Sequence, residues 1–398
     1  MHKADTGTFA ETFGVSLVRG DIFYRLQRRV GLIPPDGLGI ARRALFWSLF
    51  TWLPIALWAW YTGRAFSPEV VQEPLLGHFG IHVRFLVAVP LLIVAEGMAH
   101  GLTTRLLPYF VQSGVVPEAE LPRFRSVLAG VVKLRDGVMP WIAVLAIAVA
   151  IVTVSDTIHE SHEIVWASGG GGAVLHLDFG ALWFLYVGRP IYLTLLLGWL
   201  WRIILLLLLF RGIAKLDLVI VPTHPDRAGG LSFIERFPKS FAPVVLAVGA
   251  VLAARMAHDV YYHGVSVQSL RLPMIAFVVA AVAVVLLPLL VFAAPLLKAK
   301  KQALLDYGAL IGSHGRLVHE RWIAGRDVKD DAILNAPEIG PVADTLSLYG
   351  AVKDMHAVPL GKASVAPILL AAAAPMLVVL AIQVPVKDIL KILMKALL

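Results

Sequence analysis

Long apolar blocks alternate with polar, basic connections along nearly the whole chain. Crossing about 30 Å of hydrocarbon takes roughly 20 apolar residues at 1.5 Å each. Blocks close to this length number seven, and the pattern therefore predicts an all-α, polytopic transmembrane helical bundle of about seven spans. The predicted spans are Ala44–Tyr61, Gly80–His100, Gly137–Ser155, Phe179–Phe210, Phe241–His258, Pro273–Leu297 and Val365–Gln383.

Basic residues fall in every second connection between these blocks. Lys and Arg number seven before the first span and then one, five, zero, five, one and nine in the successive gaps. Cytoplasmic loops carry the excess of Lys and Arg. We therefore expect a multi-pass membrane protein with a cytoplasmic N-terminus.

The composition agrees with a membrane location. The 398 residues are 58% hydrophobic and 16% charged, whereas soluble domains carry about a quarter charged residues. The net charge of +8 comes from residues beside apolar segments, so anionic lipid headgroups are the expected partner and nucleic acid is not. The absence of cysteine excludes disulfides and thiolate chemistry.

The pattern divides the chain into four parts: a cytoplasmic amphipathic arm (1–43), a six-span bundle (44–297), a cytoplasmic helical insert (298–364), and the last span with an amphipathic tail (365–398). The arm is expected to form an interfacial helix from Phe9 to Val30. The insert, at about 65 residues, is too small to fold alone, so we expect it to pack on the bundle or to self-associate as a homo-oligomer. No internal repeat is expected, because the two halves of the chain share neither short spans nor matched Gly or Pro breaks.

The fourth span is too long for one perpendicular crossing. It contains Pro190, and a kinked, tilted helix is expected there. The side on which the tail 386–398 lies stays open, because its lysines conflict with the charge rule if all seven spans cross.

Ionisable residues within the spans are the first functional candidates, because such groups are costly in a bilayer and face the bundle interior or water. Glu96 is expected to lie inside the bundle with His100 one turn away. Arg84, Arg189 and Arg255 are expected near the outer ends of their helices, where they could line an anion-attracting vestibule; snorkelling is the alternative. The intramembrane set is Arg84, Glu96, His100, Arg189, Arg202, Arg255 and Asp259.

Two further motifs suggest ligands. The outer loop contains His159, His162, His176 and Asp178, which could hold a divalent metal, although a solvated loop is the simpler interpretation. The Pro-Asp-Arg-Ala-Gly-Gly stretch predicts an anion-binding turn, with a rigid connector as the alternative. Its candidate residues are His224, Asp226, Arg227, Gly229 and Gly230.

This turn, the Leu348-Tyr349 to Met355-His356-Ala-Val-Pro359 stretch and the last span with its Lys-rich tail resemble an uncharacterised family of bacterial multi-pass membrane proteins. The resemblance implies a bacterial inner membrane and no activity. A channel or transporter for an ion or small solute is the first functional hypothesis. The alternatives are a membrane scaffold or sensor, and an enzyme that uses the turn residues on a phosphorylated or lipid substrate.

Overall fold

The computed structural model describes residues 13–66, 74–158, 165–167, 178–326 and 340–383. These residues form helices joined by turns, and none of them lies in a β-strand. Six of the described helices are long and apolar enough to cross a membrane, and a bent pair of helices can supply a seventh crossing. The predicted helical membrane bundle is confirmed.

Each predicted span corresponds to a described helix or to a nearly continuous run of helices. The boundaries are α3 Ile40–Tyr61; α4 Phe79–His82, the π-helical η2 Val83–Ala88 and α5 Val89–Gln112; α7 Met139–Ile158; α8 Phe179–Trp183, the π-helical η5 Phe184–Gly188 and α9 Arg189–Ile213; the 3-10 helix η6 Ser232–Phe241 and α10 Ala242–Tyr262; α11 Arg271–Leu290; and α14 Lys362–Gln383.

The third crossing differs from its prediction. Helix α7 follows a second helix, α6 (Leu121–Asp136), and the two meet at an angle of 44°. Helix α6 is not among the predicted spans, because its mixed polar and apolar residues do not form an apolar block. Phe124, Leu128 and Val131 of α6 are nevertheless buried, and α6 packs against α9.

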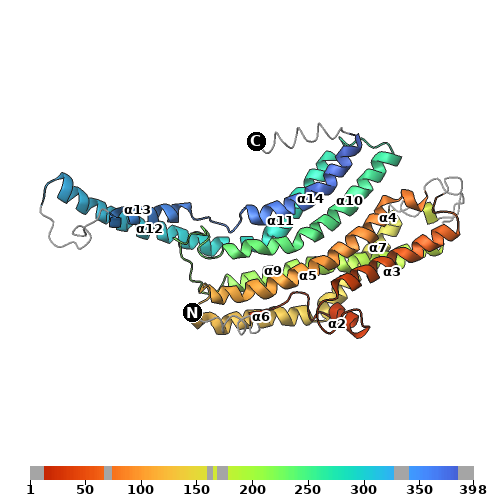
Figure 1. Ribbon diagram of the computed structural model, residues 1–398, viewed down its shortest axis with the longest axis horizontal. Coiled ribbons are helices and arrows are strands. Elements are labelled where there is room, and N and C mark those ends of the chain that lie inside the picture. Colours follow the sequence, from red (N-terminus) through yellow and green to blue (C-terminus); the bar gives the residue numbers. More distant parts are fainter. Residues whose placement is uncertain (1–12, 67–73, 159–164, 168–177, 327–339, 384–398) are drawn as a thin grey trace.

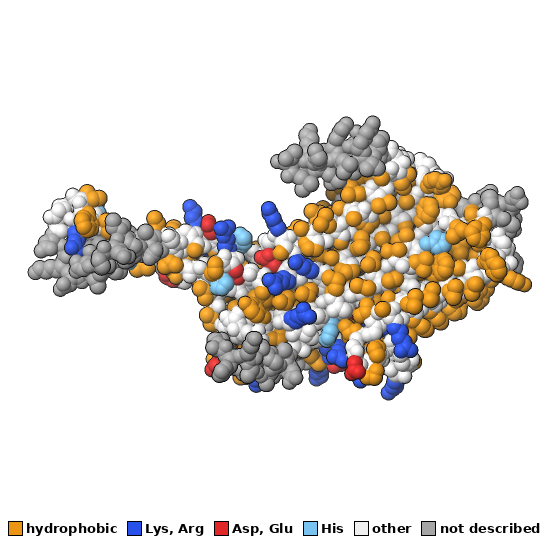
Figure 2. Space-filling model, in the orientation of Figure 1, with side chains coloured by type: hydrophobic (Ala, Val, Ile, Leu, Met, Phe, Trp, Pro, Cys, Tyr) orange, Lys and Arg blue, Asp and Glu red, His pale blue; other side chains and the backbone are white. Residues whose placement is uncertain are grey.

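The bundle has two distinguishable ends and two groups of helices. Helices α10, α11 and α14 lie together on one side, and α3, α5, α7 and α9 lie on the other, with α5 in contact with α10 (Figure 1). We call the end that carries α6 and the N-terminal helix α2 (Ile22–Arg29) the arm end, and the end that carries α4 the far end. Charged side chains gather toward the arm end, whereas apolar side chains cover most of the visible bundle surface (Figure 2).

The N-terminal arm is part of the protein interior. Residues 14–21 are not helical and α2 begins at Ile22, so the expected single interfacial helix from Phe9 to Val30 is wrong. Phe13 and Leu17 are buried, and the Phe13 ring lies 5.8 Å from that of Phe124. Phe13 and Leu17 therefore belong to the protein core, with Phe13 on α6, whereas Leu26 and Val30 are 56% and 65% exposed.

Two spans carry the same irregularity at corresponding positions. Segment η2 precedes Pro90 and segment η5 precedes Pro190. Proline lacks the amide N–H of the helical ladder and its ring clashes with the preceding turn, so the backbone widens there. The Phe85 and Phe184 rings lie 6.0 Å apart, and Gly188 packs directly on Phe85. Both breaks lie in the first half of the chain, so they match two spans within that half and do not relate one half to the other.

The insert projects away from the bundle. Helix α12 (Ala293–Val318), its π-helical end η7 (His319–Ile323) and α13 (Gly340–Asp354) form a hairpin that extends beyond the arm end (Figure 1). The base of the hairpin is fixed, because Lys300 Nζ donates hydrogen bonds to the carbonyls of Lys353 and Met355 at 2.9 and 2.6 Å. In the described part of the insert, α12 and α13 pack mainly on each other.

Candidate functional site

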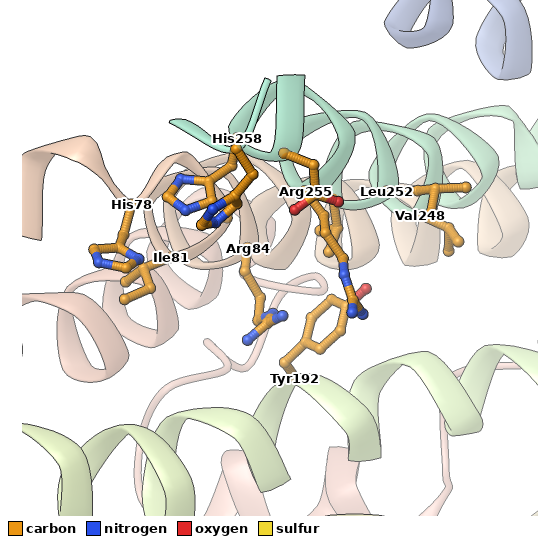
Figure 3. Close-up of a pocket in the computed structure, with 12 residues that line it drawn as sticks. His78, Ile81, Arg84, Tyr192, Val248, Leu252, Arg255 and His258 are labelled. Carbon is orange, nitrogen blue, oxygen red and sulfur yellow. The ribbon is translucent and has the colours of Figure 1, made fainter. Parts of the chain in front are cut away.

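A cavity of about 460 Å³ lies in the far half of the bundle, between η2, α9 and α10 (Figure 3). Its lining brings Arg84 and Arg255 together from different spans, with Asp259 one turn after Arg255. This volume is in the range of small-molecule sites. The polar and aromatic lining residues are His78, Arg84, Tyr192, Arg255, His258, Asp259 and His263.

Aromatic rings hold the guanidinium of Arg84. Its Cζ lies 5.4 Å from the centroid of Phe184 and 5.8 Å from that of Tyr192. The π-helical turn of η2 places Arg84 on the cavity side, next to Phe85, which is fully buried against Gly188. Rings at this distance attract a cation and keep its donors oriented. Arg84 is therefore held at the cavity and does not snorkel outward as a loose side chain.

Imidazole groups form the wall nearest the far end. The rings of His78 and His258 are stacked at 5.2 Å, and His263 lies 5.5 Å from His258. The Nδ1 atom of His258 lies 3.3 Å from the Gly77 carbonyl oxygen. Nothing in the spacing of these histidines along the chain indicates that they lie with Arg84. They add hydrogen-bonding nitrogens to a cavity whose fixed charges are two arginines and one aspartate.

Glu96 lies at the centre of a buried ion network nearer the arm end. Its carboxylate oxygens lie 2.6 Å from Arg43 Nη2 and 2.9 Å from Arg202 Nη2. Arg202 Nη2 also donates to Asp21 Oδ2 at 3.0 Å. The residues are 1–4% exposed, and two arginines balance two carboxylates. Glu96 therefore faces protein, and both of its carboxylate oxygens are paired with arginines.

The network fastens the N-terminal arm to three spans. Asp21 caps α2 by accepting the Tyr24 amide at 2.7 Å, and Gln27 Oε1 accepts from Arg43 Nε at 2.7 Å and Trp47 Nε1 at 3.0 Å. His100 was expected as the partner of Glu96, but the described ion pairs of Glu96 are with arginines. Glu96 is thus paired with residues of two facing helices and not with the residue one turn away on its own helix.

In the Pro-Asp-Arg-Ala-Gly-Gly turn, the backbone amides bind a carboxylate of the turn itself. The Asp226 carboxylate accepts from the amides of Ala228, Gly230 and Ser232 at 2.8, 3.1 and 3.1 Å. Burial raises the pKa of Asp226, but these amide hydrogen bonds outweigh burial and hold the pKa below its ordinary value. The amides that the prediction assigned to an external anion are thus occupied.

The rest of this turn has the geometry of a rigid connector. Gly229 and Gly230 have φ of 64° and 94°, and Arg227 also has a positive φ of 57°. His224 Nδ1 lies 2.8 Å from Asp226 Oδ1, and the Arg227 carbonyl accepts from the His356 amide at 2.7 Å. The turn therefore joins the fifth span to the base of the α12–α13 hairpin.

The remaining candidates are dispersed. Arg189 begins α9 and does not line the far-end cavity. Asp178 is ion-paired with Arg64 at 2.8 Å. The other metal candidates, His159, His162 and His176, lie outside the described residues, as does the tail 384–398. Among the described residues no group of three or more metal-ligating side chains comes together.

Several site residues escaped the sequence analysis. Arg43 and Asp21 lie at or before the start of the first apolar block, where basic and acidic residues are expected to be solvated. Tyr192 is one apolar residue among many in its span. The usable signal was the pair of Phe-Gly segments that precede Pro90 and Pro190 at equal spacing, which marks the two helices that meet at the cavity and the network.

No family model, curated protein or solved structure matches this chain.

Proposed function

We propose that the protein is an integral membrane transporter for a small anion. The observation that carries the proposal is the far-end cavity, in which Arg84 and Arg255 converge from different spans on a volume of about 460 Å³. Charge-assisted hydrogen bonds to an arginine are stronger than neutral ones, and paired donors recognise carboxylate or phosphate groups. A small organic carboxylate or an inorganic oxyanion fits this lining.

The packing between the cavity and the arm end supports a transporter over an open channel. Trp199 is almost fully buried, and its Nε1 donates to the Leu92 carbonyl at 2.9 Å between α9 and α5. One turn further along both helices, Arg202 and Glu96 form their ion pair. These contacts seal the α5–α9 interface below the level of Arg84. A transporter exposes its binding site to one side of the membrane at a time, which requires a closed interface on the other side.

We further propose that the arm end is cytoplasmic and that the membrane is a bacterial inner membrane. The support for the orientation is the alternation of Lys and Arg between connections, 26 on the arm-end side against two on the other. The support for a bacterial inner membrane is the resemblance to an uncharacterised family of bacterial multi-pass membrane proteins. A reporter fused after Arg326 should be cytoplasmic, and one fused after Ser168 should be periplasmic. The opposite labelling would reverse the orientation.

Anion binding is tested first by titration. Purified protein in detergent is titrated calorimetrically with acetate, succinate, phosphate and sulfate. Loss of one charge-assisted hydrogen bond costs about 1.5–3 kcal/mol, so Arg84→Gln and Arg255→Gln should each weaken the best anion about 10- to 100-fold. Arg271→Gln is the matched control, because Arg271 is an exposed arginine near the far end that does not line the cavity. If Arg84→Gln and Arg255→Gln bind the anion as tightly as Arg271→Gln and the wild-type protein, the proposal is wrong.

A scaffold is the second candidate function, and the α12–α13 hairpin favours it. The hairpin exposes large apolar side chains beyond the bundle, including Leu305, Leu346 and Trp322. If it docks a second copy of the chain, the double variant Leu305→Asp/Leu346→Asp should convert an oligomer to a monomer in light-scattering measurements. A wild-type monomer at working concentrations would count against this function.

A further inference from the structure

A second, smaller cavity of about 190 Å³ lies beside the buried ion network. It is bounded mainly by apolar side chains of α2, α3, α7 and α9, among them Phe23, Trp47, Ile191 and Leu195. Leu145 of α7 also lines it and is 49% exposed on the bundle surface. The neighbouring α7 residue Ile142 is exposed as well. The cavity therefore reaches the apolar surface that faces the bilayer.

Two N–H donors at this cavity have no acceptor in the described chain. They are Trp141 Nε1 and Arg202 Nε, and their residues are 5% and 4% exposed. The Trp141 ring is held in place by the Phe23 ring at 4.7 Å and by close packing on Gly198. A buried donor without an acceptor is costly in a native protein, and such groups commonly mark a missing partner.

The charge balance indicates the chemistry of that partner. Arg43 and Arg202 contribute two positive charges, and Asp21 and Glu96 contribute two negative charges, so the network is neutral without a ligand. An additional anion would leave an unbalanced charge in a buried place. A neutral oxygen acceptor satisfies the donors without that cost.

The depth of the cavity suggests where this acceptor comes from. Trp141 is the third residue of α7, so it lies near the arm-end boundary of the hydrocarbon. Tryptophan is enriched at this level, between the headgroups and the acyl chains. The ester groups of glycerolipids lie there, with their acyl chains directed toward the bilayer centre.

We propose that the cavity binds one glycerolipid of the arm-end leaflet, with an ester carbonyl accepting from Trp141 Nε1 or Arg202 Nε and an acyl chain along Leu145, Ile191 and Leu195. The lipid would fill the space between α7 and α9 and complete the hydrogen bonding of the ion network. This site is separate from the far-end cavity and does not depend on the transport proposal.

The test uses full-length protein in nanodiscs that contain a phosphatidylethanolamine with a photoactivatable diazirine in its acyl chain. After illumination, labelled residues are mapped by peptide mass spectrometry. The expected label lies on Leu145, Ile191 or Leu195, and the bilayer-facing Ile275 of α11 serves as the internal reference. An ether-linked lipid with the same headgroup and chain lacks the carbonyl and should label the cavity about fivefold to tenfold less, the effect of one hydrogen bond.

Variants separate the site from general lipid contact. Trp141→Phe keeps the ring but removes the donor, and should lower cavity labelling several-fold for the ester lipid only. Trp201→Phe is the matched control, because the Trp201 Nε1 is also buried without a partner but does not line this cavity. Thr194→Phe fills the cavity and should abolish labelling there while Ile275 is labelled as before. Should Thr194→Phe not yield folded protein, Leu145→Trp at the mouth replaces it.

Equal labelling by ester and ether lipids would overturn the assigned acceptor. Cavity labelling that is no higher than that of the Ile275 reference, or that survives filling of the cavity, would overturn the site.

Discussion

Replacing Glu96 by glutamine is the most informative perturbation of the fold. Glutamine keeps the size of the side chain but removes its charge. Among the described residues, Arg43 and Arg202 are then left with Asp21 as the one carboxylate within 3.0 Å of either. The network then carries a net charge of +1 in a place where its residues are 1–4% exposed. Breaking a buried pair in this way costs about 3–5 kcal/mol.

The assay is the free energy of unfolding of the protein in a defined detergent, measured by denaturant titration with tryptophan fluorescence. The double variant Glu96→Leu/Arg43→Leu provides the control, because it removes one charge of each sign and leaves Arg202 paired with Asp21. It should be more stable than the single variant Glu96→Leu, and the coupling energy follows from the double-mutant cycle. A loss of less than 1 kcal/mol in Glu96→Gln would refute the buried network as a stabilising element.

Two further predictions concern glycines. Gly188→Leu should strongly reduce the yield of folded protein, since even a Cβ at this position would lie 2.6 Å from the Phe85 ring, where the two π-helical segments pack. Size-exclusion chromatography of the purified variant checks this, and a normal monodisperse peak would contradict it. Gly229→Val should unfold the connector, because the φ of 64° at this position suits glycine and a Cβ there would meet Ile220. Arg227→Ala should change the free energy of unfolding by at most ~0.5 kcal/mol, because the Arg227 side chain is exposed. Similar losses in the two variants would show that Arg227 has a role beyond the connector.

Hydrophobic patterning was enough to predict the spans and the burial of Glu96, because the bilayer imposes both. It did not predict the partners of Glu96. Local reasoning proposed His100 on the same helix, but Arg43 and Arg202 come from two facing helices and Asp21 from an arm that was expected to lie in the interface. Partners that are distant in sequence depend on helix packing, which a pattern along the chain does not contain.

The same distinction applies to the candidate sites. The position of Arg84 and Arg255 along their predicted spans was sufficient to place both toward one end of the bundle, and both line one cavity in the structure. It was insufficient to identify Tyr192, because an apolar span gives no sign of which aromatic residue faces inward. At the connecting turn, the Gly pair predicted the positive φ values, but not that the Asp226 carboxylate would occupy the free amides.

Anion flux through reconstituted protein tests the central proposal most directly. Proteoliposomes are loaded with the tightest-binding anion from the calorimetric panel, and its efflux is followed after dilution into anion-free buffer. The proposal predicts efflux well above protein-free liposomes, a loss of at least about tenfold in Arg84→Gln, and normal efflux in Arg271→Gln. Efflux at the protein-free level, or equal efflux from Arg84→Gln and wild-type protein, would contradict a transporter that recognises its anion in the far-end cavity.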